Sequence, residues 1–319
     1  MALCTLRPDD LLLAKQRIRE IVLATPIMRS DAIDAELGLQ AVFKCEQLQH
    51  TGSFKLRGAS HAVSLLPEDC PGVATHSSGN HGAALARAAR ARGLAAQVVM
   101  PENAVRAKVD AVRAQGGVVH FCEPTQQARE AGLAEWVARG YEAVPPYDDD
   151  RIIAGQGSCA LELFEQDPEL DFVVAPVGGG GLLAGTALAA RTLDRPVSVI
   201  GVEPDGADDT RRSLAAGERV TEHHPRTMAD GLRALIGQRN LELIETHAET
   251  VLGVDEHDIV AAMVLVWHHL KQVVEPSGAV ALAGVMTHPE LFRGRRVGVI
   301  LSGGNLDIPP LLEPFLRDD

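Results

Sequence analysis

Short apolar runs that alternate with helix-like segments are the feature that most restricts what this chain of 319 residues can fold into. The runs are rich in valine, isoleucine and leucine and contain few polar residues, which predicts strands buried on both faces. Strands that alternate with helices form mainly parallel sheets with helices on both sides. We predict strands at residues 73–76, 96–100, 118–122, 172–177, 197–202 and 297–301, and helices at residues 81–92, 104–115, 126–139, 182–193 and 259–271.

Composition and charge narrow the classes of function. The chain has 30 basic and 43 acidic residues, a net charge of −13, and lacks the basic surface that nucleic acid or an anionic membrane requires. Five widely spaced cysteines without a C-x-x-C pair argue against a disulfide framework or a zinc site and favour a reducing, cytoplasmic setting. The longest uncharged stretch, residues 172–190, contains four consecutive glycines, so we expect strand, loop and helix there rather than a membrane span.

Lysine is scarce, since only five of the 30 basic residues are lysines. One of them, Lys55, follows the small polar stretch Thr51-Gly52-Ser53 and Phe54 and precedes a helical pattern over residues 56–66. A lysine held near a partly desolvated helix start has a lowered pKa, and its neutral amine can form a Schiff base. The alternative is an ordinary solvated lysine in the first turn of a helix.

A polar loop directly follows the strand predicted at residues 73–76, with the sequence Ser77-Ser78-Gly79-Asn80-His81-Gly82. It opens a helix, where free backbone N–H groups and the positive end of the helix dipole attract an anion such as a carboxylate. A simple capping loop is the alternative, because serine and asparagine are common N-caps. The run of polar and glycine residues after a buried strand favours an anion site.

Four consecutive glycines, Gly178 to Gly181, follow the strand predicted at residues 172–177. They expose a run of backbone N–H groups that can hold a phosphate. Gly179, Gly181 and Ala184 also satisfy G-x-G-x-x-A, with Glu203 near the end of the next strand, so a dinucleotide is an alternative ligand.

A third small polar loop, Ser302-Gly303-Gly304-Asn305, follows the last predicted strand. Ligands of such folds bind beyond the carboxyl ends of the strands, where all of these loops lie. A reactive amine, an anion loop and a phosphate loop together suggest pyridoxal phosphate (PLP) acting on amino acids. The aldehyde of PLP needs a lysine, its phosphate needs N–H donors, and the substrate carboxylate needs a second anion site.

In their order, these segments resemble the fold-type II PLP enzymes of the serine racemase and serine/threonine dehydratase family. The likeness covers nearly the whole chain and rests on residues 52–58 (GSFKLRG), 77–82 (SSGNHG), 153–157 (IAGQG), 176–181 (PVGGGG), 229–231 (ADG), 275–276 (EP) and 301–305 (LSGGN). It implies an α/β fold of the tryptophan synthase β type. A small mobile domain, residues 70–146, would be inserted in a large PLP-binding domain, residues 1–69 and 147–319, each with a mainly parallel sheet, and the protein would be a homodimer.

The resemblance also implies roles for single residues. Lys55 would be the Schiff-base lysine, with Phe54 packing beside the cofactor ring. The other cofactor contacts would be Asn80 to the 3′-oxygen, Ser302 to the pyridine nitrogen, and the loop of Gly178, Gly179, Gly180, Gly181 and Leu182 to the phosphate. The substrate carboxylate would lie among Ser77, Ser78, Asn80 and His81.

Three further assignments depend on the same resemblance. Ser78 matches the racemase residue that acts as acid and base on the cofactor face opposite the lysine. Arg129 matches a position that can meet a second substrate carboxylate. The alternative interpretation is an ordinary solvated arginine on a helix. Glu203, the Ala207 carbonyl and Asp209 match a divalent-cation site, and such hard oxygen ligands suit Mg²⁺, Ca²⁺ or Mn²⁺.

The activity implied is deamination of a β-hydroxy amino acid to a 2-oxo acid and ammonia, with racemisation of serine or an aspartate-type amino acid as an accompanying reaction. L-serine, L-threonine and threo-3-hydroxyaspartate all suit the motifs. One alternative is PLP-dependent β-replacement, as in cysteine synthases. Others, from different classes, are an NAD-dependent dehydrogenase that uses the glycine loop and a non-catalytic amino-acid sensor, but the dehydrogenase leaves Lys55 and the Ser77–Gly82 loop unexplained.

Overall fold

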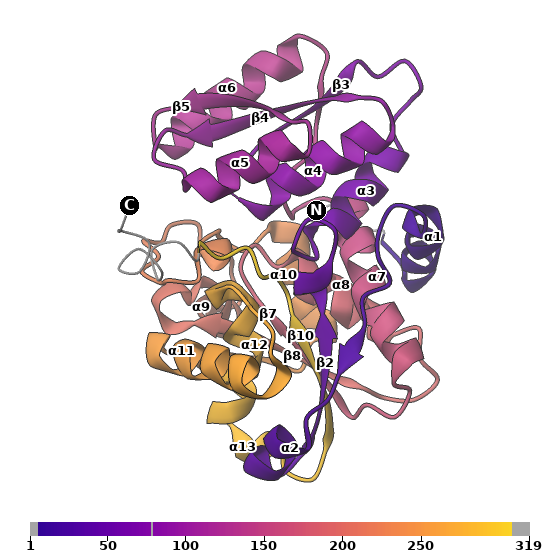
Figure 1. Ribbon diagram of the computed structural model, residues 1–319, viewed down its shortest axis with the longest axis vertical. Coiled ribbons are helices and arrows are strands. Elements are labelled where there is room, and N and C mark those ends of the chain that lie inside the picture. The colour runs from indigo at the N-terminus through magenta and orange to yellow at the C-terminus, as the bar shows by residue number, and fades with distance from the viewer. Residues whose placement is uncertain (1–5, 78, 308–319) are drawn as a thin grey trace, which may run out of the picture.

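Two separate sheets, each covered by helices on both faces, make up the computed structural model, which describes residues 6–77 and 79–307 (Figure 1). The larger sheet has the strand order β1-β2-β10-β7-β8-β9, and only its β1–β2 pair is antiparallel. Its strands are β1 (Ile27–Met28), β2 (Gln40–Cys45), β7 (Phe172–Pro176), β8 (Ser198–Pro204), β9 (Thr250–Val254) and β10 (Arg296–Leu301). The smaller sheet is parallel, in the order β5-β4-β3-β6, with β3 (Gly72–His76), β4 (Ala95–Pro101), β5 (Val118–Cys122) and β6 (Glu142–Ala143).

Helices cover the two faces of the smaller sheet. On one side lie α4 (Asn80–Ala91) and α5 (Arg106–Ala114), and on the other lies α6 (Gln126–Ala138). Gly82 of α4 approaches Val98, whereas Gly132 of α6 approaches Val99, the next residue of β4. Successive strand residues point to opposite faces, so the continuous apolar run of β4 is buried from both sides.

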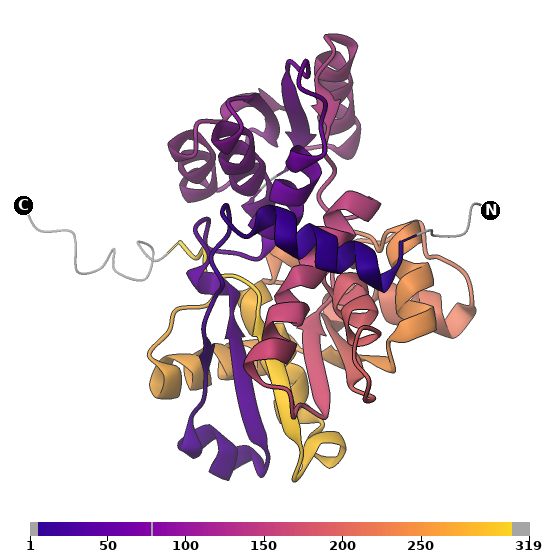
Figure 2. The same ribbon diagram turned by 90° about the vertical axis from the view of Figure 1, so that its right-hand side faces the viewer.

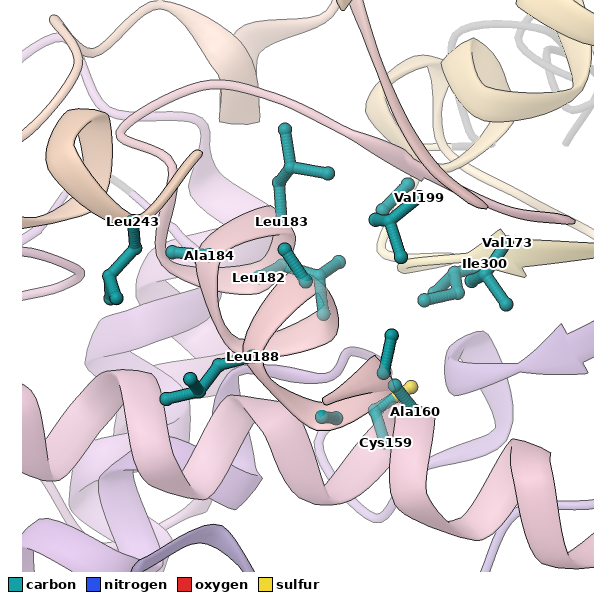
Figure 3. Packing of buried hydrophobic residues seen from close by; sticks show 14 of the residues in the cluster. Cys159, Ala160, Val173, Leu182, Leu183, Ala184, Leu188, Val199, Leu243 and Ile300 are labelled. Atoms are coloured by element: carbon teal, nitrogen blue, oxygen red, sulfur yellow. The ribbon is translucent and has the colours of Figure 1, made fainter. Parts of the chain in front are cut away.

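The larger sheet is built in the same way. One face carries α12 (Pro276–Thr287), backed by α11 (Glu256–Leu265), and the other carries α8 (Gly181–Ala190), backed by α7 (Asp150–Gln166) and α10 (Gln238–His247). Every residue of α8 is buried, and Figure 3 shows its side chains between those of α7 and of the strands. A helix that is apolar all round needs such a position, because it has no face for water.

The remaining elements connect these layers. They are α1 (Pro8–Ile18), α2 (Asp31–Leu37), η1 (Glu46–Leu48), α3 (Lys55–Ser64), η2 (Asp205–Ala207), α9 (Asp209–Ala216), η3 (Asp230–Leu232), the π-helical turn η4 (Val266–Leu270) and α13 (Pro289–Phe292). Helix α3 contacts both α4 and α7 and so joins the two halves of the molecule (Figure 1). Helix α1 lies across α7 and α3 (Figure 2).

The predicted α/β fold is confirmed, because each predicted strand and helix has a counterpart within a few residues. The helix predicted at residues 259–271 starts earlier, at Glu256, and ends in η4. The smaller sheet lies within residues 72–143, and the division into domains at residues 70 and 146 stays a prediction. Over the described ranges, no helix combines the length and the apolar character needed to cross a membrane.

Candidate active site

Lys55 is the first residue of α3 and lies beside the loop that follows β10. The Phe54 N–H donates to the Ser302 carbonyl at 3.1 Å, the Gly304 N–H donates to the Gly52 carbonyl at 2.9 Å, and a β-bridge joins Ser53 to Gly303. Two segments almost 250 residues apart are thus bound together at the carboxyl edge of the larger sheet. The predicted neighbours Lys55 and Ser302 are therefore brought into one site.

The amine of Lys55 lies in a low-dielectric environment. Its Nζ donates a hydrogen bond to the Pro146 carbonyl at 3.0 Å and lies 5.0 Å from the centroid of the Phe54 ring. Burial lowers the pKa of Lys55 from 10.5 to about 8, although the negative charge of Glu275 opposes this shift. The fraction of neutral, nucleophilic amine near neutral pH is therefore far larger than for an ordinary lysine, as attachment to an aldehyde requires.

A buried ion-pair network holds the start of α3. The Arg57 side chain is fully buried, donates to both oxygens of Glu46 at 2.8 Å, and donates to both oxygens of Glu162 at 2.7 Å. Because Glu46 lies just beyond β2 and Glu162 on α7, this one side chain fixes the first turn of α3 against two other elements.

The loop after β3 supplies an amide that belongs to the same site. Asn80 Nδ2 donates to Glu275 Oε1 at 2.6 Å, and Asn80 Oδ1 accepts from Asn305 Nδ2 at 2.8 Å. Asn80 is the first residue of α4, so these two bonds bring the smaller sheet's helix to the β10 loop and to the start of α12. Asn80 thus meets Asn305 and Glu275 at one point, and its cofactor contact stays a prediction.

The side chains of Ser77 and His81, in the same loop, form different hydrogen bonds. Ser77 Oγ accepts from the Gly79 and Gly82 N–H groups at 3.2 Å, so its side chain orders the helix start as a capping residue does. His81 is only 2% exposed, its Nε2 lies 3.0 Å from the Val144 carbonyl, and burial lowers its pKa to about 3. The His81 ring is therefore neutral and adds no charge to the loop. Ser78 lies outside the described residues.

The four-glycine loop has the features of an anion cradle. Among described residues, no acceptor bonds the N–H groups of Gly178 to Gly181 or of Leu182, and these groups precede or begin α8. The Gly179 carbonyl points away, since it accepts from Asn240 Nδ2 at 2.5 Å and from the Gly237 N–H at 3.1 Å. A Cβ at Gly179 would lie 2.3 Å from the Tyr147 ring, so this position requires glycine.

Ser302 offers a neutral hydroxyl near the amine. It is 3% exposed, and its Oγ donates to the Ser277 carbonyl at 3.3 Å. Ser277 Oγ in turn accepts from the Gly231 N–H at 3.0 Å, and Gly178 lies against Leu232. The loop after β10 and the glycine loop after β7 are thus connected through η3.

Arg129 lies in the first turns of α6, half-buried, with its Nε donating to the Thr125 carbonyl at 3.4 Å. Burial lowers the pKa of His76, and the charge of the Arg129 guanidinium lowers it further, so the guanidinium lies within electrostatic range of His76. His76 is the last residue of β3 and directly precedes the Ser77 loop. Arg129 therefore lies at the border of the predicted substrate loop.

The residues predicted to bind a cation are only partly arranged for it. Glu203 is 1% exposed; its Oε1 accepts from the Arg211 N–H at 2.9 Å and its Oε2 from the Thr210 N–H at 3.2 Å. Asp209 accepts from the Ile236 N–H at 2.7 Å. Within residues 6–77 and 79–307, no group of three His, Cys, Asp or Glu side chains is placed to hold a metal, so a cation there depends on the Ala207 carbonyl.

The same geometry bears on the dinucleotide alternative. That alternative needs Glu203 to bond a ribose hydroxyl, but Glu203 is 1% exposed and its carboxylate caps the first turn of α9. A phosphorylated aldehyde suits the site better, because the amine of Lys55, the unbonded N–H groups of the glycine loop and the Ser302 hydroxyl lie around one centre.

Four residues around this centre received no role from the sequence: Tyr147, Lys108, Asp230 and Glu275. The Tyr147 ring packs on Gly179, Lys108 forms an ion pair with Asp230, and Glu275 is 3% exposed. Burial raises the pKa of Glu275 to about 7. Glu275 and Asp230 lie in the segments 275–276 and 229–231 that carry the family resemblance, whereas Tyr147 and Lys108 reach the site only through tertiary contacts that no local pattern reveals.

Comparisons with known proteins agree with this site. Residues 18–303 match the family described as pyridoxal-phosphate dependent enzyme. The chain is 46% identical over 306 residues to beta-hydroxyaspartate dehydratase of Paracoccus denitrificans, which covers 95% of this chain and 97% of that protein. It is 41% identical over 317 residues to serine racemase of Dictyostelium discoideum, covering 97% of each.

Solved structures show the same fold over the full length. The structure of maize serine racemase superimposes with a TM-score of 0.94 at 37% identity and covers 98% of each chain. This likeness confirms the expected fold-type II architecture, and the family match spans the glycine loop. The chain belongs to the pyridoxal-phosphate dependent enzyme family.

Proposed function

We propose that this enzyme deaminates a β-hydroxy amino acid and that its preferred substrate is the dicarboxylate 3-hydroxyaspartate. The observation that carries the choice of a dicarboxylate is the position of the Arg129 charge within electrostatic range of His76, which directly precedes the Ser77 loop. The 46% identity to a beta-hydroxyaspartate dehydratase supports it. An arginine there supplies two N–H donors to the second carboxylate of a substrate. The substrates serine and threonine lack a second carboxylate and would leave these donors unused.

Each residue of the site has a separate role in the proposed deamination. Bound PLP withdraws electrons from the bonds at the substrate Cα. The neutral Lys55 amine takes the Cα proton as general base, and the β-hydroxyl leaves with a proton as water. Hydrolysis of the resulting enamine gives the 2-oxo acid and ammonia. The Ser77 loop and the start of α4 hold the α-carboxylate, and Ser302 meets the pyridine nitrogen with a neutral hydroxyl.

The test compares turnover of 3-hydroxyaspartate, L-serine and L-threonine by the PLP-loaded enzyme, scoring the 2-oxo acid. We expect Arg129→Ala to lower kcat/KM for hydroxyaspartate by about 10- to 100-fold, the effect of one charge-assisted hydrogen bond, and to change serine turnover little. Arg139→Ala, at the other end of α6 and over the Trp136 ring, is the matched control. Equal losses for both substrates would remove Arg129 from this role.

Racemisation is a second outcome of the same chemistry, and it needs an acid on the face opposite Lys55, which we assign to Ser78. Chiral analysis of unreacted substrate tests it: Ser78→Ala should abolish formation of the D-enantiomer while Lys55-dependent 2-oxo acid formation persists. β-Replacement stays the second candidate within the family, and turnover of O-acetylserine with a thiol would favour it.

We also propose a divalent cation bound by Glu203, Asp209 and the Ala207 carbonyl. The support is that these two buried carboxylates lie near each other, where hard oxygen ligands of like charge suit Mg²⁺ or Ca²⁺. Addition of Mg²⁺ should raise the melting temperature of the wild type, and the rise should be absent in Glu203→Gln. A cytoplasmic location and a homodimer stay predictions of the same kind.

A further inference from the structure

Asn80 is held from both sides by side chains of the opposite half of the molecule. Its Oδ1 accepts from Asn305 Nδ2 at 2.8 Å, and its Nδ2 donates to Glu275 Oε1 at 2.6 Å. Asn305 follows β10 and Glu275 directly precedes α12, so three distant segments meet at this one amide.

The direction of each hydrogen bond that joins Asn305, Asn80 and Glu275 follows from which atoms can donate and which can only accept. Asn305 Nδ2 also contacts the Thr51 carbonyl at 2.9 Å, and a carbonyl can only accept. Both hydrogens of Asn305 Nδ2 are therefore used, one on Thr51 and one on Asn80 Oδ1. The Asn80 nitrogen must then face Glu275, whose carboxylate is an acceptor. The flipped amide would place a donor against a donor at Asn305.

The approach of Asn305 depends on a glycine. A Cβ at Gly52 would lie 2.2 Å from Asn305 Oδ1, and the φ of Gly52 is +71°. Gly52 is also bound through its carbonyl to the Gly304 N–H at 2.9 Å. The loop that leads into Lys55 is thus shaped around the Asn305 side chain.

One donor of the amide remains for a ligand. Asn80 Nδ2 carries two hydrogens, and among described residues only Glu275 accepts one of them. We propose that Asn305 and Glu275 are positioning residues that lock the Asn80 amide with its second N–H directed to the 3′-oxygen of PLP. The proposal rests on the assignment of the cofactor to Lys55 and Asn80, and not on the choice of substrate.

The test uses PLP itself as the probe. Apoenzyme is titrated with PLP, followed by the visible absorbance of the lysine-bound cofactor, and the apparent Kd and the pH dependence of the absorbance are recorded. Asn305→Asp keeps the size of the side chain but replaces the donor with an acceptor. We expect the Kd to rise at least about 10-fold, the effect of one lost hydrogen bond, and the pH at which the absorbance changes to shift. Glu275→Leu removes the acceptor on the other side of Asn80 and should raise the Kd in the same way.

A double-mutant cycle separates positioning from a structural effect. If Asn305 acts through Asn80, Asn305→Asp has no further effect on the Kd in the Asn80→Ala background. Asn103→Asp, an exposed asparagine, is the control for the added charge. If Asn305→Asp does not fold, as judged by its thermal unfolding, Asn305→Ala takes its place in the cycle.

Two results would overturn the proposal: an unchanged Kd in the Asn305 variant, or an equal loss with and without Asn80. No substrate enters the titration, so failure of the hydroxyaspartate assay with an intact cycle refutes only the proposed substrate. Failure of wild-type apoenzyme to take up PLP would instead refute the assignment of the cofactor site.

Discussion

Lys108 of α5 forms an ion pair with Asp230 of η3 and so joins a helix of the smaller sheet to the opposite wall of the site. The Lys108 side chain is 12% exposed, and it also lies against Gly79 in the predicted substrate loop. Together with the bonds of Asn80, this pair defines how the two halves of the molecule meet above Lys55.

Breaking this pair should loosen α5. We expect Lys108→Met to raise the amide hydrogen-exchange rates of residues 106–114 up to about 5-fold, because a partly exposed pair contributes about 1 kcal/mol or less. Arg106→Met is the control, since Arg106 pairs with Asp110 within the same helix and is exposed. Unchanged exchange in Lys108→Met, or an equal change in both variants, would show that the pair does not restrain α5.

The lowered pKa of Lys55 predicts how fast the apoenzyme takes up PLP at different pH. Only the neutral amine attacks an aldehyde, so the rate should rise with pH and level off above about 8 rather than above 10.5. Stopped-flow absorbance at several pH values measures it. Lys55→Ala should give no visible band and no activity, whereas Lys15→Ala, which removes a partly exposed partner of Glu165, should behave like the wild type. A rate that keeps rising to pH 10 would contradict the low pKa.

The raised pKa of Glu275 makes one contribution to stability pH-dependent. Between about 4.5 and about 7 the folded chain keeps this proton and the unfolded chain has lost it, so each rise in pH favours unfolding. Its stabilising contribution is complete below 4.5 and is lost as the pH passes 7. Relative to Glu275→Gln, which does not titrate, the wild type should therefore become less stable as the pH rises from 5 to 8. Urea unfolding of both proteins measures the difference, and a constant difference would be inconsistent with a titration there.

Arg57 should be a strong determinant of stability. Arg57→Met leaves Glu46 and Glu162 buried without their shared cation, and we expect a loss of about 3–5 kcal/mol in the free energy of unfolding. Arg29→Met, which removes a half-exposed partner of Asp167, should cost far less. If both substitutions lower the free energy of unfolding equally in chemical denaturation, burial of the ion-pair network is not the cause of its stabilising effect.

Much of the architecture was predictable because the parallel strands carry uninterrupted apolar runs that end in glycine and serine loops. β2 was not predicted, although it lies inside the larger sheet, because Lys44 breaks its apolar pattern. Lys44 is fully buried there, with Glu162 Oε2 at 2.8 Å and the Thr25 carbonyl at 2.7 Å as partners. α12 was missed for the opposite reason, since it is buried almost all round and has no helical periodicity.

The candidate site, like the fold, could be predicted only in part from the sequence. Asn80, the glycine loop and Ser302 each follow a predicted strand, and Lys55 follows a small polar stretch before a helical pattern, so their loops could be named from the sequence. The bonds that give them direction could not, because Glu275, Asn305 and Asp230 act on residues more than 100 positions away. Arg129 and the cation ligands were suggested only by resemblance, and their roles stay predictions.

The place of β10 has a consequence for synthesis of the chain. Of the strands in the described residues, β10 leaves the ribosome after all the others, yet it lies between β2 and β7 in the middle of the larger sheet. Until residue 301 has emerged, β2 and β7 have no common neighbour, and the loop before Lys55 lacks its partner at Gly303. The nascent enzyme therefore exposes two apolar strand edges, a state that is prone to aggregation and that chaperones would have to shield. It also cannot hold its cofactor until β10 is inserted.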